Sequence, residues 1–540
     1  MTSPVPSQDR PTAVLDEAHV GDIEGAFGTL RQHDQVEHRS WRARLLVLLA
    51  IIGPGLIVMV GDNDAGGVAT YAQAGQNFGL SLLWTLPLLI PVLVVNQEMV
   101  VRLGAVTGVG HARLINERFG RFWGAFSVGD LFILNFLTIA TEFIGVSLSL
   151  GYFGVSKYVS VPVAGVALVA MTLTGSFRRW ERFMFVFIVA NFLVIPLAVF
   201  RHPSAGALFH ALVVPGVRGG FNSTSVLLII AIVGTTVAPW QLFFQQSNII
   251  DKRITPRWIN YERTDTVLGS LVTVFAAVLI MAIVAAAFDH TPLSGHFTDA
   301  GGVALGLQRY VSHAAGVLFA IVLLNASIIG AASVTLSTSY AFGDVFGARH
   351  SLHRGWREAK AFYGIFAGLV VLAATIVLIP GAPLGVITTA VQALAGVLLP
   401  SATVFLLLLC NDREVLGPWV NRTWLNVVAF VIVSILLMMS LVLMVTTLFS
   451  GIDVRTLALA LAGVLGVTYL VGALYLVVRW HRRPLAPPEP VERRETWRMP
   501  PLSLLGRPQW SKGRVVTMYA LRAYLVIAAL LLLVKAIRLG

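Results

Sequence analysis

Two short polar interruptions inside long apolar stretches carry the side chains best suited to chemistry in this chain. The first, residues 61–67, holds two aspartates among three glycines, and the second, residues 235–241, holds two threonines ahead of a proline. Neither contains Cys or His, so the ligand atoms on offer are carboxylate, hydroxyl, amide and backbone oxygens. Oxygen ligands favour hard divalent cations such as Mg²⁺, Ca²⁺ or Mn²⁺ over softer transition metals. The two interruptions therefore predict a binding site for a hard cation.

The aspartates of the first interruption lie near the bilayer midplane if the helix that contains them starts near residue 43. An ionised Asp at that depth costs at least about 2.5–3.5 kcal/mol unless it is compensated. The nearest basic residue on the segment, Arg44, lies several turns away. A carboxylate that only caps a broken helix end is the alternative, but two acids beside three glycines exceed what a cap needs. We therefore expect a bound cation, and the candidate residues are Gly61, Asp62, Asp64 and Gly67.

The second interruption supplies backbone oxygen rather than charge. Pro239 has no N–H and its ring clashes with the carbonyl four residues earlier, which would free oxygens near Thr235 and Thr236. Such carbonyls are hard ligands suited to a metal ion, and a simple proline kink is the alternative. Small residues at both interruptions predict a roomy cavity, which suits Mg²⁺ because this ion keeps several of its waters. The candidates here are Thr235, Ala238 and Gln241, with Trp240 as a wedge or a gate.

The elements that must position these residues are membrane-spanning helices. The chain has 540 residues, of which 56% are hydrophobic and 12% charged, a composition far from that of a soluble domain. Apolar windows of about 20 residues, enough to cross the hydrocarbon core, recur along it. We expect about 12 helices, near 43–75, 78–104, 122–150, 155–175, 183–200, 223–249, 263–288, 303–346, 358–379, 382–410, 424–448 and 454–479. The segment 303–346 is too long for one span and should include an external lead-in.

Basic residues predict how these helices are oriented. Alternate loops are rich in arginine and lysine, and under the positive-inside rule they lie in the cytosol together with the N-terminus. The residues are Arg113, Arg118 and Arg121; Arg178, Arg179 and Arg182; Lys252, Arg253 and Arg257; Arg349, Arg354 and Arg357; and Arg479, Arg482 and Arg483. The net charge of +12 is then an orientation signal, and no nucleic-acid partner is needed to explain it. We expect a multi-pass protein of the plasma membrane.

The flanking segments differ from the helical domain, 43–479. Residues 1–42 are polar and mixed in charge, which predicts a disordered cytosolic tail. Residues 480–513 form a Pro/Arg-rich linker, and 514–540 hold a last apolar segment that either spans the membrane or lies at its surface.

Cys410 is the only cysteine, so no disulfide framework is possible, and no nucleotide-binding loop occurs. These features argue against an ATP-driven pump.

Two further sets of residues have plain structural interpretations. Glu98 and Arg102 are four residues apart near a helix end and predict a structural ion pair. His111 and His290 fall in predicted loops and should be solvated.

A resemblance becomes specific at the first interruption. Gly53-Pro54-Gly55, then Asp64-Ala65-Gly66-Gly67-Val68-Ala69-Thr70 and Gln73-Ala74-Gly75, resemble the first helix of the Nramp metal-ion transporters. Further matches cover about residues 43–450 and include Gln97, Arg102, Glu142, Pro239, Gln392 eight residues before Pro400, and Asn411-Asp412-Arg413 with Gly417 and Asn421. The resemblance implies an all-α LeuT-type fold, with two five-helix inverted repeats and broken helices 1 and 6. It also implies alternating access around a midplane site.

Departures from the family pattern bear on the transported ion. The family binds its metal with Asp, Asn, a Met thioether and backbone carbonyls; here the Asp is Asp64, the Asn position is Gly67 and the Met position is Ala238. The resemblance also carries over Gln392 as a candidate ligand, and titratable family positions are occupied here by Ile139, Trp240 and Gln245. Losing the thioether removes the soft ligand that favours Mn²⁺ and Fe²⁺. The pattern resembles the Nramp-related magnesium transporter branch.

We therefore predict a transporter of Mg²⁺, with Mn²⁺ as a further substrate, that works by alternating access without proton coupling. Glu142 is the titratable group that remains, as a relic of a proton relay or as part of the ion path; Trp240 and Gln245 are further gating or coupling candidates. One alternative is a proton-coupled Mn²⁺ or Fe²⁺ importer, and another is an amino-acid or organic-cation transporter of the same fold. A receptor without transport is a third. No catalytic motif predicts an enzyme, and no cofactor or protein partner is predicted beyond the cation and the bilayer.

Overall fold

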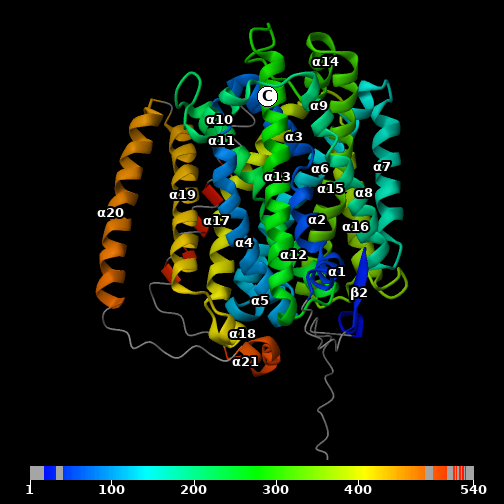
Figure 1. Ribbon diagram of the computed structural model, residues 1–540, viewed down its shortest axis with the longest axis vertical. Coiled ribbons are helices and arrows are strands. Elements are labelled where there is room, and N and C mark those ends of the chain that lie inside the picture. Colours follow the sequence, from blue (N-terminus) through cyan, green and yellow to red (C-terminus); the bar gives the residue numbers. More distant parts are fainter. Residues whose placement is uncertain are drawn as a thin grey trace, which may run out of the picture.

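The chain folds almost entirely into helices that stand side by side (Figure 1). The computed structural model describes residues 17–31, 40–449, 451–480 and 491–506, and isolated positions between 515 and 530. Within these ranges 10 helices are long and apolar enough to cross a membrane, or 11 if the bent pair α1 (Trp41–Ile51) and α2 (Pro54–Gly61) forms one span. The apolar helix α7 (Lys157–Thr172) is shorter. The prediction of an all-α integral membrane protein is confirmed.

The helices follow the predicted order. The long ones are α4 (Thr85–Thr107), α6 (Arg121–Tyr152), α8 and α9 (Phe177–Asn191 and Val194–Phe200), α11 and α12 (Ser223–Thr236 and Pro239–Asp251), α13 (Ile259–Phe288), α15 (His313–Phe346), α16 (Lys360–Leu378), α17 (Leu384–Cys410), α19 (Thr423–Leu448) and α20 (Val454–Trp480). The shorter ones are α3 (Ala65–Phe78), α5 (His111–Phe119), α10 (Ala205–Val213), α14 (Ala300–Tyr310), α18 (Arg413–Leu416) and α21 (Val491–Thr496), with 3₁₀ turns η1 (Glu17–His19), η2 (Gly79–Leu82), η3 (Pro256–Trp258), η4 (Gly417–Trp419) and η5 (Leu502–Leu504). The lead-in expected before α15 is the separate helix α14.

Both polar interruptions break their helices, as predicted. The first separates α2 from α3 at residues 62–64, and the second separates α11 from α12 at residues 237–238. Because α12 packs on α2 while α11 packs on α3, the two broken helices run antiparallel and their breaks meet. Four helix ends therefore converge on one point inside the protein.

A second bend separates α1 from α2 below the first break. The two helices meet at 54° at Gly53, whose φ of 155° lies in the region that favours glycine. Asp265 of α13 accepts hydrogen bonds from the N–H groups of Gly53 at 3.0 Å and Gly55 at 2.7 Å. The short helix α2 is thus bounded by a bend at one end and a break at the other, with its first amides bound to a carboxylate.

Residues 17–31 are ordered, so the prediction of disorder across residues 1–42 is wrong for this part; 1–16 and 32–39 lie outside the described residues. Strands β1 (Ile23–Gly25) and β2 (Gly28–Leu30) form an antiparallel hairpin that packs on α1. The Ala26 carbonyl accepts a hydrogen bond from Arg182 at 3.1 Å, and the Ala18 carbonyl accepts one from Arg253 at 3.0 Å. Arginines that the sequence assigned only to orientation thus also hold this N-terminal segment in place.

Part of the predicted C-terminal linker is also docked on the helices. The Met499 N–H donates to the Val106 carbonyl at 3.3 Å, at the end of α4. In the last apolar segment, the Arg522 guanidinium lies 3.9 Å from the centre of the Phe122 ring. Most of residues 514–540 lie outside the described residues, so the choice between a span and a surface helix stays a prediction.

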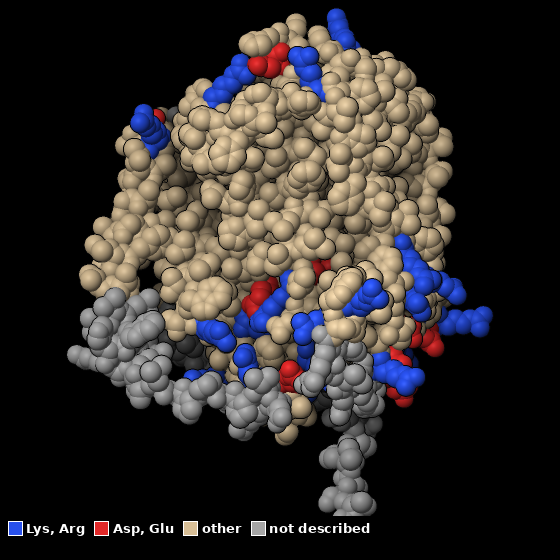
Figure 2. Space-filling model, in the orientation of Figure 1, with Lys and Arg blue, Asp and Glu red and all other residues tan. Residues whose placement is uncertain are grey.

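Charged side chains lie mainly at one end of the molecule. Figure 2 shows most arginines, lysines and acids at the lower end, a broad uncharged middle, and a few charges at the upper end. This distribution is what a membrane-spanning helical domain requires, because the hydrocarbon region excludes charge. The lower end is called the arginine-rich end below.

A buried group of charges lies where α2 begins. Lys252 donates to Glu181 and, at 2.8 Å, to the Ile52 carbonyl, and both charged side chains are fully buried. The carboxylates of Asp265 and Glu262 on α13 are buried near this pair. One lysine therefore faces three carboxyl groups at the point where α1, α2, α8, α12 and α13 meet.

We expect Lys252→Met to destabilise the protein by about 3–5 kcal/mol, because removing one partner of a buried ion pair leaves the other charge uncompensated. The thermal melting of the purified chain in detergent measures this change. Lys252→Met combined with Glu181→Gln should recover part of the loss, since the carboxylate left unpaired is then neutral. Melting of Lys252→Met at the wild-type temperature would show that the pair is not structural.

Candidate metal-ion site

The meeting of the two helix breaks creates a site of mixed polarity. Helices α3 and α12 begin there, so their free N–H groups give a positive partial charge, while α2 and α11 end there and give a negative one. Carboxylates are stabilised at the first kind of end and cations at the second. The same point can therefore hold both acidic side chains and a positive ion.

Asp64 serves partly as a helix cap. It is the N-cap residue of α3, and its Oδ1 accepts the Gly67 N–H at 2.7 Å. Glu142 of α6 supports the same end, because its Oε2 accepts the Ala65 N–H at 3.0 Å. A side chain at Gly330 of α15 would lie 2.6 Å from both the Asp64 Cβ and the Glu142 Oε2, so α15 can pass closely here only with glycine. The two carboxyl groups are therefore held together at the start of α3.

Asp62 is placed differently and has no such role. Its side chain is fully buried and faces the Ala238 backbone and the Gln241 side chain across the two breaks. Neither of its carboxylate oxygens accepts a hydrogen bond from the described residues. A buried polar group without a partner costs about 1–3 kcal/mol, and more when it is charged. A ligand that binds these oxygens would remove this cost.

Other buried polar atoms around Asp62 also lack partners within the described residues. They come from the two halves of the second broken helix, α11 and α12, and from the neighbouring helices α15 and α17, and they are Thr235 Oγ1, Gln241 Nε2, Ser333 Oγ and Gln392 Nε2. Buried groups in proteins are nearly always hydrogen-bonded to protein or water. Several unsatisfied atoms at one point thus favour occupation by water or by a hydrated ion.

The glycines bring these groups together rather than leaving space. A side chain at Gly67 would lie 2.9 Å from the Asp62 carbonyl and 3.2 Å from the Thr235 Oγ1, and one at Gly66 would overlap the Gln392 amide. Two small cavities adjoin the breaks, of about 20 Å³ beside Pro239 and about 10 Å³ beside Ala65, the smaller of which is close to the volume one water needs. The expectation of a roomy cavity is wrong for this closed arrangement, because polar groups of adjacent helices fill it.

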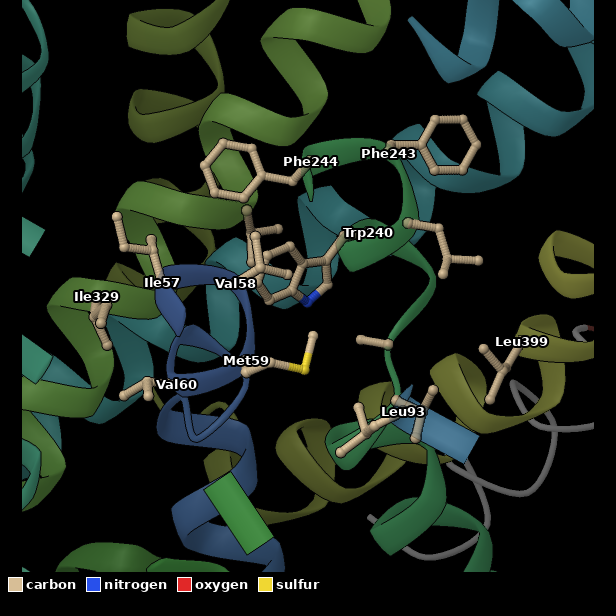
Figure 3. Close-up of a cluster of buried hydrophobic side chains, with 14 of the residues drawn as sticks. Ile57, Val58, Met59, Val60, Leu93, Trp240, Phe243, Phe244, Ile329 and Leu399 are labelled. Carbon is tan, nitrogen blue, oxygen red and sulfur yellow. The ribbon is translucent and has the colours of Figure 1, made fainter. Parts of the chain in front are cut away.

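Trp240 covers the site on the side of the arginine-rich end. Figure 3 shows its indole reaching from α12 toward α2, beside Met59. The side chain is fully buried, and a side chain at Gly61 would lie 3.5 Å from its ring, so the indole packs on the backbone of α2 just before the break. The predicted positions of Gly61 and Trp240 are therefore in contact with each other, next to the polar cluster.

The structure brings together most of the predicted site residues and separates one. Asp62, Asp64, Gly67, Thr235, Ala238, Gln241 and Gln392 surround the breaks. Gln245 does not join them, because its Nε2 donates to Thr266 of α13 at 2.9 Å. It lies two turns along α12, where it belongs with the buried charges near Lys252.

Several polar residues near the breaks were not predicted as part of the site. Ser333 lies on α15 against Gly61, the Gln97 amide donates to Gln241 at 3.2 Å, and the Tyr71 hydroxyl bonds the Thr236 hydroxyl at 2.8 Å. Gln97 carried a signal, since it belongs to the motif that resembles the family's second helix. Serine and tyrosine in apolar helices give no comparable signal.

Two expectations about residues outside the site have different outcomes. The Glu98–Arg102 pair is confirmed, with the Arg102 Nε donating to Glu98 at 3.1 Å. His111 is buried on α5 rather than solvated, and its Nδ1 lies 2.8 Å from the Gln246 Oε1. Burial lowers the pKa of His111 to about 4, so this imidazole is neutral near pH 7.

The ligand set limits which ions fit. No group of three or more His, Cys, Asp or Glu side chains that could hold a metal occurs within the described ranges. An ion at the breaks would therefore be bound by the carboxylates of Asp62 and Asp64, by amide, hydroxyl and backbone oxygens, and by water. That set matches ions that keep part of their hydration shell, of which Mg²⁺ is the clearest case.

The amino-acid sequence is similar to a known protein family and to two named proteins. The family model described as natural resistance-associated macrophage protein-like matches residues 55–446. A protein named divalent metal cation transporter MntH from Klebsiella pneumoniae strain 342 is 28% identical over 418 residues, which cover 74% of this chain and 95% of that protein. Its counterpart from the subspecies pneumoniae strain ATCC 700721 is 27% identical, over 78% of this chain and 99% of that protein.

Solved structures share the fold. The Eremococcus coleocola manganese transporter in complex with an aromatic bis-isothiourea substituted compound superposes with a TM-score of 0.61 at 20% identity, over 81% of this chain and 97% of that one. A mutant of the same transporter also gives 0.61, at 19% identity, over 84% and 99% of the two chains. This similarity confirms the LeuT-type fold that the sequence predicted.

We expect Asp64→Asn to fold normally but to lower cation uptake by about tenfold or more. Asparagine caps helices as well as aspartate does, so the bond to Gly67 is kept. The negative charge is lost, however, and a hydrogen bond to a charged group contributes about 1.5–3 kcal/mol. Divalent-cation flux into proteoliposomes measures the effect.

Asp453→Asn provides the control, because Asp453 is an exposed carboxylate that accepts the Thr456 N–H at 2.8 Å at the start of α20. It should transport like the wild type. Wild-type flux in Asp64→Asn would mean that the cation binds elsewhere.

Proposed function

Because this chain belongs to the natural resistance-associated macrophage protein (Nramp) family, we propose that it carries a divalent metal cation across the membrane through the two helix breaks, and that Mg²⁺ is its main substrate. The observation that carries this proposal is Asp62, a fully buried carboxylate whose two oxygens have no hydrogen-bond partner within the described residues. It lies between the breaks with Asp64 and the oxygen ligands of α11. A membrane transporter, rather than an enzyme or a receptor, is the class that this family supports. We further propose that it lies in the plasma membrane with its arginine-rich end in the cytosol.

The ligands favour Mg²⁺ over softer ions. Ala238 opens α12 at the position where the family resemblance places a thioether, and a methyl group cannot coordinate a metal. The remaining ligands are oxygen atoms from Asp62, Asp64, Thr235 and the backbone, which suit Mg²⁺. The amide nitrogens of Gln241 and Gln392, which have no hydrogen-bond partner within the described residues, can donate to the waters that Mg²⁺ retains. Both the direct ligands and their surroundings are thus suited to a hydrated ion.

Mn²⁺ is the second candidate substrate, and a specific observation favours it. The solved structures that share this fold come from a protein named a manganese transporter. Mn²⁺ also accepts carboxylate, carbonyl and water ligands. The distinction between the two ions therefore depends on the thioether position, which makes Ala238 the residue to test.

We propose that transport is driven by the concentration gradient and the membrane potential without proton movement. Glu142 is held by the Ala65 N–H at the start of α3, and His111 is neutral near pH 7. Residues 139, 240 and 245 are Ile, Trp and Gln, whose side chains neither gain nor lose a proton near pH 7. The potential alone contributes about 4.6 kcal/mol per 100 mV for a divalent ion, at about 2.3 kcal/mol per charge.

We expect Ala238→Met to shift the preference from Mg²⁺ toward Mn²⁺ and Cd²⁺, because it places a soft sulfur at the start of α12. The shift is measured in proteoliposomes by how strongly Mg²⁺ and Cd²⁺ each compete with Mn²⁺ for uptake. Leu242→Met is the matched control, since it adds the same sulfur about one turn further along α12 without adding bulk. An unchanged Mg²⁺ preference in Ala238→Met would show that selectivity is set elsewhere.

We expect no acidification inside liposomes during Mg²⁺ uptake, as reported by an enclosed pH dye. Uptake should instead follow a potassium-diffusion potential set with valinomycin. Glu142→Gln should retain the contact to Ala65, because a glutamine oxygen also accepts an N–H, and should still transport. A proton signal proportional to metal uptake and lost in Glu142→Gln would establish the proton-coupled alternative.

A further inference from the structure

A pocket of about 380 Å³ opens at the arginine-rich end, away from the helix breaks. It lies between the last turns of α4, the segment that leads into α13, the start of α19, and α21. Its lining divides into two parts. One is apolar and includes Val94, Val420 and Leu425, and the other is polar and holds five arginines and two glutamates.

The position of the pocket matches the membrane surface. α4 ends at Thr107, α13 begins at Ile259 and α19 begins at Thr423, so three spans enter or leave the bilayer around it. Trp424, which is 59% exposed, stands at its edge, and tryptophan is enriched where hydrocarbon meets the headgroups. With the membrane surface at this level, the apolar part would face the acyl region and the polar part would face the headgroups.

The charges of the pocket favour an anion. Glu98 accepts hydrogen bonds from Arg102 at 3.1 Å and from Arg263 at 3.0 Å, which neutralises this carboxylate. Arg422 at the mouth is exposed, and Arg494 lies 4.4 Å from the centre of the Trp419 ring. Five arginines against two glutamates leave an excess of positive charge. Such a lining repels a divalent cation, so the pocket is not a continuation of the ion path.

We propose that this pocket binds an anionic phospholipid, with its phosphate among the arginines and the first part of its acyl chains against Val94, Val420 and Leu425. Arginine binds phosphate oxygens in a two-pronged geometry, and basic pockets between helices on the cytosolic side are suited to anionic headgroups. The bound lipid would connect α4 and α13, which flank the broken helix α2–α3 and α12. This site is separate from the metal-ion site and does not depend on which cation is transported.

The test uses the purified full chain in detergent micelles, with thermal melting followed while phosphatidylglycerol is titrated in. Phosphatidylglycerol should raise the melting temperature, whereas phosphatidylcholine and inorganic phosphate at equal concentration should not. The amount of phosphatidylglycerol needed for half of the shift should rise about fivefold in Arg422→Gln and about 25-fold in Arg257→Gln/Arg422→Gln, since each arginine near an anionic surface contributes about a factor of five.

The matched control is Arg349→Gln/Arg357→Gln, which removes two exposed arginines on the same end but outside the pocket. It should respond to phosphatidylglycerol like the wild type. If the control and the pocket double variant lose the response equally, the effect is a general surface charge and the proposal fails. An equal shift with phosphatidylcholine, or with inorganic phosphate, would also overturn it. Arg422→Gln keeps the test valid if the double variant does not fold, because Arg422 is exposed.

Discussion

In a bilayer core every backbone N–H and C=O needs a partner from within the protein, and the two interrupted helices break the helical hydrogen-bond pattern inside their spans. Acidic side chains meet part of this demand. Asp265 binds the first amides of α2, and Asp64 and Glu142 bind those of α3. The side-chain amide of Asn63, within the first break, donates to the Thr273 carbonyl of α13 at 3.0 Å. The polar atoms that have no partner within the described part of the chain, above all those of Asp62, are the ones that we propose bind the cation.

This arrangement connects the site to the arginine-rich end through one short helix. α2 ends at the break that holds the two aspartates, packs against Trp240 at Gly61, and begins at the bend that Asp265, Glu181 and Lys252 surround. This helix has 8 residues, and the bend at one end and the break at the other interrupt its helical hydrogen bonding to α1 and α3. Alternating access requires such an element, because hinge closure is absorbed at a few positions next to rigid helices. The hairpin of residues 17–31 lies against α1 and α8, where it would have to move with this element.

Sequence patterns predicted the helices and their breaks well, because length, apolar content, Gly and Pro act locally. The span expected at 122–150 is α6, residues 121–152, and the break expected at Pro239 ends α11 and starts α12. Contacts between distant segments could not be predicted: Asp265 lies 212 residues from the Gly53 amide that it binds, and the Arg253 partner of Ala18 lies 235 residues away. The family resemblance likewise identified only Asp64 as the metal-binding aspartate. Only the structure shows that an Asp64 oxygen is used by the helix cap while neither Asp62 oxygen accepts a hydrogen bond from the residues that the structure describes.

The location of the cation is the central claim, and anomalous X-ray scattering tests it most directly. Crystals of the full chain grown with Mn²⁺, which scatters anomalously, should show one strong peak between the carboxylates of Asp62 and Asp64 and the Thr235 side of the second break. An excess of Mg²⁺ should remove that peak, because both ions would compete for the same oxygen ligands. A peak elsewhere, or one that persists in excess Mg²⁺, would contradict the site or its proposed preference.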